Sequence, residues 1–277
     1  MRGQLTILCE NTVTRPGGLM GEHGFACLLE TEQGRFLFDT GQGLALLQNA
    51  RLLGKDLSGL DGVILSHGHG DHSGGLLPLL EAHGPLPVFA HPGIFTPRFW
   101  AGRFERRPNG CPFGPDELRE AGGRLQPVRH FRQLVPGFHL SGEVPRSNDF
   151  ERGDPHLMVA GEGEELLPDP FVDDLSVALE TERGLLVILG CAHAGLINIL
   201  RHFHSQVESR KIFAVIGGTH LGPADDQQFA ATLDALRPYS IERFGLSHCT
   251  GLARGGELAQ AFHGRVAFAN VGFQFDF

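Results

Sequence analysis

The sequence lacks any apolar run long enough to cross a lipid bilayer, since no stretch approaches the roughly 20 residues that a spanning helix needs. The first ten residues, Met1 to Glu10, also hold too short an apolar stretch for the core of a secretory signal peptide. We therefore expect no membrane partner and a cytoplasmic location.

Cysteine is scarce, and its spacing excludes two common uses. The five cysteines are an odd number, and their wide spacing does not match a disulfide framework or a structural zinc knuckle. They are Cys9, Cys27, Cys111, Cys191 and Cys249. We expect five free thiols.

Positive charge is in deficit, because 23 Lys and Arg residues stand against 32 Asp and Glu residues and give a formal net charge of −9. A protein of this sign repels polyanions, so nucleic acid is not an expected partner. The 41% hydrophobic content and the 39 glycines are typical of a loop-rich globular enzyme. The composition therefore favours a small-molecule substrate.

The predicted elements repeat the order strand, polar loop, helix. Residues 62–65 form an apolar run typical of a buried strand, and a histidine-rich loop and a helical pattern over 74–82 follow it. A second regular half begins near residue 185, and three of its predicted strand ends each carry a histidine. Two halves that present loops at one edge predict an α/β fold, a four-layer αβ/βα sandwich with a site between the sheet ends.

The middle of the chain is less regular. Residues from about 92 to 170 are rich in Gly, Pro and Arg, and only 125–128 and 138–141 have strand-like patterns. We interpret this stretch as an irregular insertion within a single domain that covers residues 1–277, because layered α/β folds commonly reach this size as one unit.

A dense run of metal-binding side chains follows the strand at 62–65. His67, His69 and His72 lie within six residues, and Asp71 stands between them. Imidazole nitrogens and carboxylate oxygens suit a borderline divalent ion such as Zn²⁺. In an extended turn His67 and His69 project to the same side, so one loop can supply two neighbouring metal ions. A solvated histidine-rich loop is the alternative, and the strand and helix that bound the run argue against it.

The pattern His67-x-His69-x-Asp71-His72 resembles the signature of the metallo-β-lactamase superfamily. Other blocks resemble one branch of it, named after a dihydropterin ribofuranosyl-aminobenzene phosphate synthase. They are Glu22-His23-Gly24-Phe25, Phe38-Asp39-Thr40-Gly41-Gln42, Leu65-Ser66-His67-Gly68-His69, Gly142-Glu143-Val144-Pro145-Arg146, Gly190-Cys191-Ala192-His193-Ala194-Gly195, Gly217-Gly218-Thr219-His220-Leu221 and Ser247-His248-Cys249-Thr250-Gly251. The resemblance implies the metallo-β-lactamase fold and a dinuclear metal site.

The same resemblance implies roles for residues outside the histidine run. Asp39 matches the carboxylate that accepts a ring N–H from a ligand histidine and fixes its orientation. His248 matches the last metal ligand and would complete a second metal site with Asp71 and His72.

The sequence departs from the family pattern at two positions. Where many members have a bridging Asp after a strand, this chain has Cys191, with His193 two residues later. Either is a competent ligand, and we favour His193 because a neutral imidazole needs no deprotonation. Asp173 and Asp174 stand where a ligand histidine is common. As an oxygen ligand, Asp174 would favour Mn²⁺ or Fe²⁺ at one site.

Four further residues are expected to act on the substrate. His220 and His91 each follow a predicted strand and have no ligand counterpart in the family, so we expect substrate contact or proton donation, with a structural histidine as the alternative. Arg98 and Arg106 stand beside aromatic residues in the insertion, where guanidinium groups could grip phosphate beneath a lid. A solvated loop is the alternative there.

Together these features predict a dinuclear metal-dependent hydrolase. Two metal ions, Zn²⁺ in first place and Mn²⁺ or Fe²⁺ as alternatives, would lower the pKa of a shared water, and the metal-bound hydroxide would attack a phosphorus or carbonyl centre. Asp71 and His220 are the expected catalytic residues, and a phosphorylated small molecule, a phosphoester or phosphodiester, is the expected substrate. The alternatives are a synthase-like pterin condensation and a metal-holding ligand sensor without turnover. A homo-oligomer is compatible with the sequence.

Overall fold

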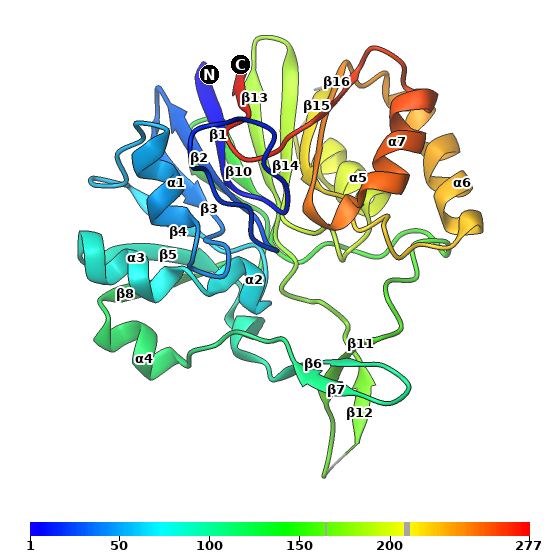
Figure 1. The fold of residues 1–277 in the computed structure, drawn as a ribbon. Coiled ribbons are helices and arrows are strands. Elements are labelled where there is room, and N and C mark those ends of the chain that lie inside the picture. The colour runs from blue at the N-terminus through cyan, green and yellow to red at the C-terminus, as the bar shows by residue number, and fades with distance from the viewer. Residues whose placement is uncertain (164, 208–210) are drawn as a thin grey trace.

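The computed structural model describes residues 1–163, 165–207 and 211–277. Its strands form two seven-stranded sheets and one four-stranded sheet. The two large sheets face each other in the middle of the molecule, and helices lie on both outer sides (Figure 1). This arrangement is the four-layer αβ/βα sandwich that the repeated strand, loop and helix pattern predicts.

The first large sheet has the strand order β18-β1-β2-β3-β4-β5-β8. Its strands are β1 (Gly3–Cys9), β2 (Ala26–Thr31), β3 (Gly34–Phe38), β4 (Gly62–Ile64), β5 (Leu86–Ala90), β8 (Gly123–Pro127) and β18 (Gln274–Asp276). Helices α1 (Leu46–Leu52), α2 (Gly70–Ser73), α3 (Leu76–His83) and α4 (Pro115–Glu120) belong to this half. Because β3, β4, β5 and β8 are parallel, their carboxyl ends lie at one edge of the sheet.

The second large sheet has the order β17-β16-β15-β14-β13-β10-β9. Its strands are β9 (Arg132–Val135), β10 (Phe138–Leu140), β13 (Val177–Thr181), β14 (Gly184–Leu189), β15 (Ile212–Gly218), β16 (Arg243–Ser247) and β17 (Val266–Phe268). Helices α5 (Leu196–Gln206), α6 (Asp226–Leu236) and α7 (Leu252–Ala261) lie along it, with 3-10 turns η1 (Pro92–Phe95), η2 (Arg237–Tyr239) and η3 (His248–Thr250) elsewhere in the chain. In the ranges that the structure describes, no helix is long and apolar enough to cross a membrane.

The core consists of three apolar clusters, one between each pair of layers. On β2, Leu29 packs into the cluster between the two sheets, whereas its neighbour Leu28 packs into the outer cluster with the helices of the first half. This division follows from the alternation of side chains along a strand. Helix α5 places Leu196, Leu200 and Phe203 on one face, at helical spacing, against the second sheet. Four layers are therefore held by three separate cores.

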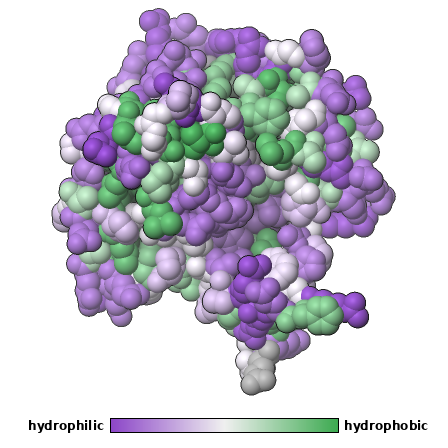
Figure 2. All heavy atoms as spheres, in the orientation of Figure 1, coloured by the Kyte–Doolittle hydropathy of each residue, from purple (hydrophilic) through white to green (hydrophobic). Residues whose placement is uncertain are grey.

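The stretch expected to be an irregular insertion is more regular than its sequence indicates. It supplies β8, β9 and β10 to the large sheets and also builds the small sheet, in the order β12-β11-β6-β7. The strands of this sheet are β6 (Arg98–Ala101), β7 (Arg106–Pro108), β11 (Leu157–Ala160) and β12 (Leu166–Pro168). The small sheet projects from the body of the molecule (Figures 1 and 2). Strands of three or four residues, two of which contain proline, leave little periodic signal in the sequence, so the prediction missed them.

Candidate metal centre

Side chains that can bind metal gather where strands of the two large sheets end. The segments that follow β4, β14, β15 and β16 carry the candidate donors His67, His69, Asp71, His72, Cys191, His193, His220 and His248. Strands β14, β15 and β16 are parallel, so their carboxyl ends share one edge. This edge meets the loop after β4, and His72 and His248, 176 residues apart in the chain, come into contact there.

The first donor group consists of His67, His69 and His193, whose ligand atoms all lie within 4.8 Å of one another. His67 Nε2 is 2.9 Å from His69 Nδ1. Burial lowers the pKa of all three imidazoles, that of His69 to about 3, so the rings are neutral and can bind a cation at physiological pH. His193 Nε2 is buried and has no hydrogen-bond partner among the described residues. Phe171 stacks on the His193 ring at 3.8 Å and fixes its plane.

The second donor group consists of Asp71, His72 and His248. Asp71 Oδ2 is 3.4 Å from His248 Nε2 and 4.0 Å from His72 Nε2, and the two imidazole nitrogens are 3.2 Å apart. Burial alone would lower the pKa of His72, but the carboxylates of Asp39 and Asp71 outweigh it and raise that pKa to about 9. A divalent cation bound here would replace the proton of His72 and offset the same negative charge.

Asp39 orients donor side chains through hydrogen bonds. Its Oδ2 lies 2.7 Å from His72 Nδ1, so the other ring nitrogen, Nε2, faces the donor cluster. Ser66 Oγ donates to the same carboxylate at 2.7 Å and also lies 2.9 Å from His67 Nδ1. The contact between Asp39 and His72 is the one expected of a carboxylate that fixes a ligand imidazole.

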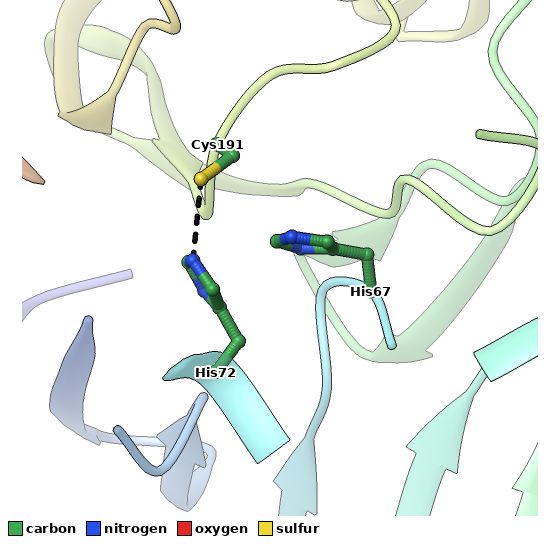
Figure 3. A group of neighbouring side chains, drawn as sticks. All are labelled: His67, His72 and Cys191. Carbon is green, nitrogen blue, oxygen red and sulfur yellow. Dashed lines mark hydrogen bonds between the residues drawn. The ribbon is translucent and has the colours of Figure 1, made fainter. Parts of the chain in front are cut away.

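Cys191 occupies the centre of the cluster. Its Sγ lies 3.2 Å from His72 Nε2, and Figure 3 shows His67 and His72 converging on it. The sulfur belongs to three groups of convergent donors: one with His67 and His72, one with His193 and His220, and one with His248 and Cys249. The chemistry of this donor set, neutral imidazoles with a carboxylate and a thiol, fits a borderline ion such as Zn²⁺.

Backbone strain is concentrated at the same place. In the described part of the chain six non-glycine residues have positive φ, and five of them surround the cluster: Asp39 (59°), Phe171 (45°), Ala192 (57°), His220 (51°) and His248 (50°). Such conformations cost energy and persist only where the surroundings impose them. Two of the strained residues, His220 and His248, themselves carry candidate donors.

A cleft of about 620 Å³ opens onto the donor atoms. Its floor includes His69, Asp71, Cys191 and His193 together with His220 and His248. Another wall carries Trp100 and Arg107 of the small sheet and Asn109, which directly follows β7. Small molecules therefore have access to the donors.

Residues 20–248 match the family model of the metallo-beta-lactamase superfamily. The chain belongs to this superfamily. It is 31% identical over 245 residues to the 7,8-dihydropterin-6-methyl-4-(beta-D-ribofuranosyl)-aminobenzene-5'-phosphate synthase of Methanocaldococcus jannaschii, a match that covers 83% of this chain and 81% of the relative.

Solved structures agree with this assignment. Tm1679, described as a metal-dependent hydrolase of the beta-lactamase superfamily, superposes with a TM-score of 0.82 at 27% identity, over 99% of this chain and 98% of that protein. The metallo-beta-lactamase fold protein YhfI of Bacillus subtilis has a TM-score of 0.58 at 14% identity, over 100% of this chain and 99% of YhfI, which shows the shared fold alone. Members of this superfamily are generally metal-dependent enzymes, and the donor groups described above are able to hold metal.

Within this superfamily fold, all six residues predicted to be ligands come together. Each belongs to at least one group of convergent donor atoms, and they are His67, His69, Asp71, His72, His193 and His248. The predicted catalytic residue His220 lies close to them, with both ring nitrogens buried and without a hydrogen-bond partner in the described ranges. Its donor atom is within reach of Cys191 and His193, so a role as a ligand competes with the expected role in proton transfer.

Two predicted residues have other partners. Asp174 Oδ2 accepts the Ala194 N–H at 2.7 Å, which shapes the turn that carries His193, and Asp174 is in none of the convergent donor groups of the described chain. Asp174 Oδ1 is buried without a hydrogen-bond partner among the described residues, so the expectation of an oxygen ligand stays a prediction. His91 does not line the cleft. Its Nε2 lies 3.0 Å from Glu143 Oε1, and its Nδ1 accepts the Gly93 N–H. The structural alternative holds for His91.

The expected roles of the arginines also require correction. Arg98 is only 3% exposed, and its guanidinium binds Asp169 and Asp173, each at 2.5 Å. It therefore supports the fold and does not reach into solvent for substrate. Arg106 is exposed but lies over Phe99 at 3.9 Å, and the arginine that lines the cleft is Arg107.

Sequence reasoning missed three residues at the site. His23 Nε2 lies 3.2 Å from Asp71 Oδ2 at the mouth of the cleft, and Asn109 Nδ2 lies 3.3 Å from His69 Nε2. Cys249 lines the cleft beside Cys191. The family-like blocks contain His23 and Cys249 and could have suggested them, whereas Asn109 carries no signal in the sequence.

Proposed function

We propose that this protein is a metal-dependent hydrolase of a phosphorylated small molecule, a phosphoester or phosphodiester. The observation that carries the proposal is a pair of donor groups, His67 with His69 and His193, and Asp71 with His72 and His248. Members of both groups line one open cleft: His69 and His193 of the first, Asp71 and His248 of the second. Metal ions held there would supply an activated water near neutral pH and would offset negative charge on the substrate.

The residues around the donors support this chemistry. Asp39 holds the His72 ring in one orientation, and Phe171 stacks on the His193 ring, so the two donor groups are preorganised. Arg107 places a cation on the cleft wall, where an anionic substrate would enter.

His220 is suited to donate a proton to a leaving group. Burial opposes its protonation, but Cys249 together with the carboxylates of Asp154 and Asp174 outweighs burial and raises the pKa of His220. The protonated imidazole, which lies on the cleft floor, is thereby more favoured than in a free histidine.

The test uses the full chain purified without chelator, with bis(4-nitrophenyl) phosphate as the probe. We expect hydrolysis that a chelator abolishes and that Zn²⁺ or Mn²⁺ restores. His69→Ala should lose metal and activity together, whereas His204→Ala, at an exposed position of α5, should keep both. Equal metal content in the two variants would disprove the assignment of the donor loop.

A second candidate is a condensation of the kind named for the archaeal relative, and the 31% identity over 83% of this chain favours it. The same cleft would then stabilise the charge of a pterin or a pyrophosphate group. The two candidates differ in outcome: a metal-loaded protein that leaves a broad phosphoester panel unchanged yet converts a pterin phosphate is a synthase.

A further inference from the structure

The wall of the cleft contains a row of three side chains on one face of the small sheet. Trp100 on β6 pairs with Leu157 on β11 and, on its other side, with Arg107 on β7. Directly paired residues on neighbouring strands project to the same face. All three line the cleft that opens onto the metal donors, so the row faces the reaction site.

The row is held at a fixed position relative to the donor loop. Gly70 N–H donates to the Asn109 carbonyl at 3.0 Å, directly after β7, and Asn109 Nδ2 contacts His69 Nε2. On the other side of His69, Gly68 N–H donates at 2.9 Å to Asp173, which is bound in turn by Arg98 of β6. The small sheet is therefore a wall that is tied to the donor loop at both ends of Gly68–Gly70.

The chemistry of the row is that of a site for a flat ring. Trp100 is half-buried and offers apolar surface, and Leu157, which is 7% exposed, contributes only its edge. The Arg107 guanidinium lies 4.8 Å from the centre of the Trp100 ring, where a further aromatic ring can stack beside it. Arg107 also forms an ion pair with Glu105 at 3.1 Å, but both side chains are about 60% exposed, so this pair competes weakly with a ligand.

We propose that Leu157, Trp100 and Arg107 form the subsite for an aromatic group of the substrate. The inference rests on the proposed function and narrows it to phosphoesters of aryl or heteroaryl alcohols: the phosphate lies at the donor groups and the flat ring lies on the row. Arg107 and Trp100 are then the residues that determine specificity.

The chain offers a matched control for Arg107. Arg106, one residue earlier on β7, stacks over Phe99 at 3.9 Å and is absent from the cleft lining. Replacing either arginine with Gln removes one positive charge from the same strand, but only Arg107→Gln changes the row.

The experiment measures binding of phenylphosphonate and methylphosphonate, which cannot be hydrolysed as esters, to the metal-loaded full chain by calorimetry. We expect phenylphosphonate to bind about tenfold more tightly, and we expect Arg107→Gln to remove most of this preference while Arg106→Gln keeps it. Trp100 is the one tryptophan of the chain, so phenylphosphonate should also change the tryptophan fluorescence and methylphosphonate should not. Trp100→Leu, checked for metal content and thermal unfolding, should lose the preference too.

The outcomes separate this inference from the proposed function. An equal affinity for the two phosphonates, or a preference that survives both Arg107→Gln and Trp100→Leu, overturns the subsite even if the protein hydrolyses phosphodiesters. A preference that depends on Arg107 and Trp100 supports the subsite even if no phosphoester is hydrolysed, and in that case only the reaction class has to change.

Discussion

Cys191 differs from the other donors because its sulfur is within reach of both donor groups. Thiolate ligation of a bound ion can be seen directly by spectroscopy, independently of turnover. We expect the Co²⁺-substituted protein to show a sulfur-to-metal charge-transfer band that is lost in Cys191→Ser and kept in Cys249→Ser, because Cys191 Sγ lies 3.2 Å from His72 Nε2. The reverse pattern would make Cys249 the ligand.

His248 and His220 both follow strands of the second sheet, yet we expect them to act differently. His248→Ala should empty the second metal site, because its Nε2 lies within 3.4 Å of both Asp71 and His72. His220→Ala should keep the metal content and lower kcat by about 10²- to 10⁴-fold, the usual contribution of a positioned proton donor, with a smaller loss for a good leaving group. Measuring both the metal content and the kinetics of the two variants distinguishes these roles. Loss of metal from His220→Ala would make His220 a ligand.

Much of the candidate site could be predicted at the level of residues. His67, His69, Asp71 and His72 lie close together in sequence, so their spacing alone indicates a shared metal site. Arg98 could not be judged in the same way, because the carboxylates that neutralise it, Asp169 and Asp173, lie more than 70 residues further along the chain. Burial of that kind leaves no local pattern in the sequence.

At the scale of elements, β6 is anchored by the buried ion pairs of Arg98. Arg98→Gln should lower the free energy of unfolding by about 3–5 kcal/mol, because Asp169 and Asp173 would be left buried without their cation. Urea denaturation measures this loss, with Arg106→Gln as the exposed control.

A second variant tests the cause of that loss. Adding Asp169→Asn and Asp173→Asn to Arg98→Gln removes the unpaired charges and should restore part of the stability. If Arg98→Gln alone leaves the unfolding free energy unchanged, β6 is held by its backbone pairing and not by these ion pairs.

The long regular elements could be predicted from periodicity, and the small sheet could not. The expected strand at 62–65 corresponds to β4 (Gly62–Ile64), and the expected helix at 74–82 corresponds to α3 (Leu76–His83). The small sheet joins β6 to β11 across more than 50 residues, and its strands are too short to show alternation. Strand β18 is a similar case, because it pairs with β1 at the opposite end of the chain.

At the scale of the whole molecule, the three core clusters explain why the fold class could be predicted. Each half of the chain carries strands that are buried on both faces and helices with one apolar face, which requires helices outside and sheets inside. The position of the small sheet does not follow from this rule, because none of its described residues belongs to any of the three clusters.

The small sheet takes β6 and β7 from the chain between β5 and β8, and β11 and β12 from the chain between β10 and β13. The codons for the wall of the cleft are therefore distinct from those for its floor. Mutation in two short stretches of the gene can remodel what enters the cleft while the inherited donor set stays intact. A library of variants confined to Leu157, Trp100 and Arg107 is the smallest one in which we expect new substrate ranges to arise by selection.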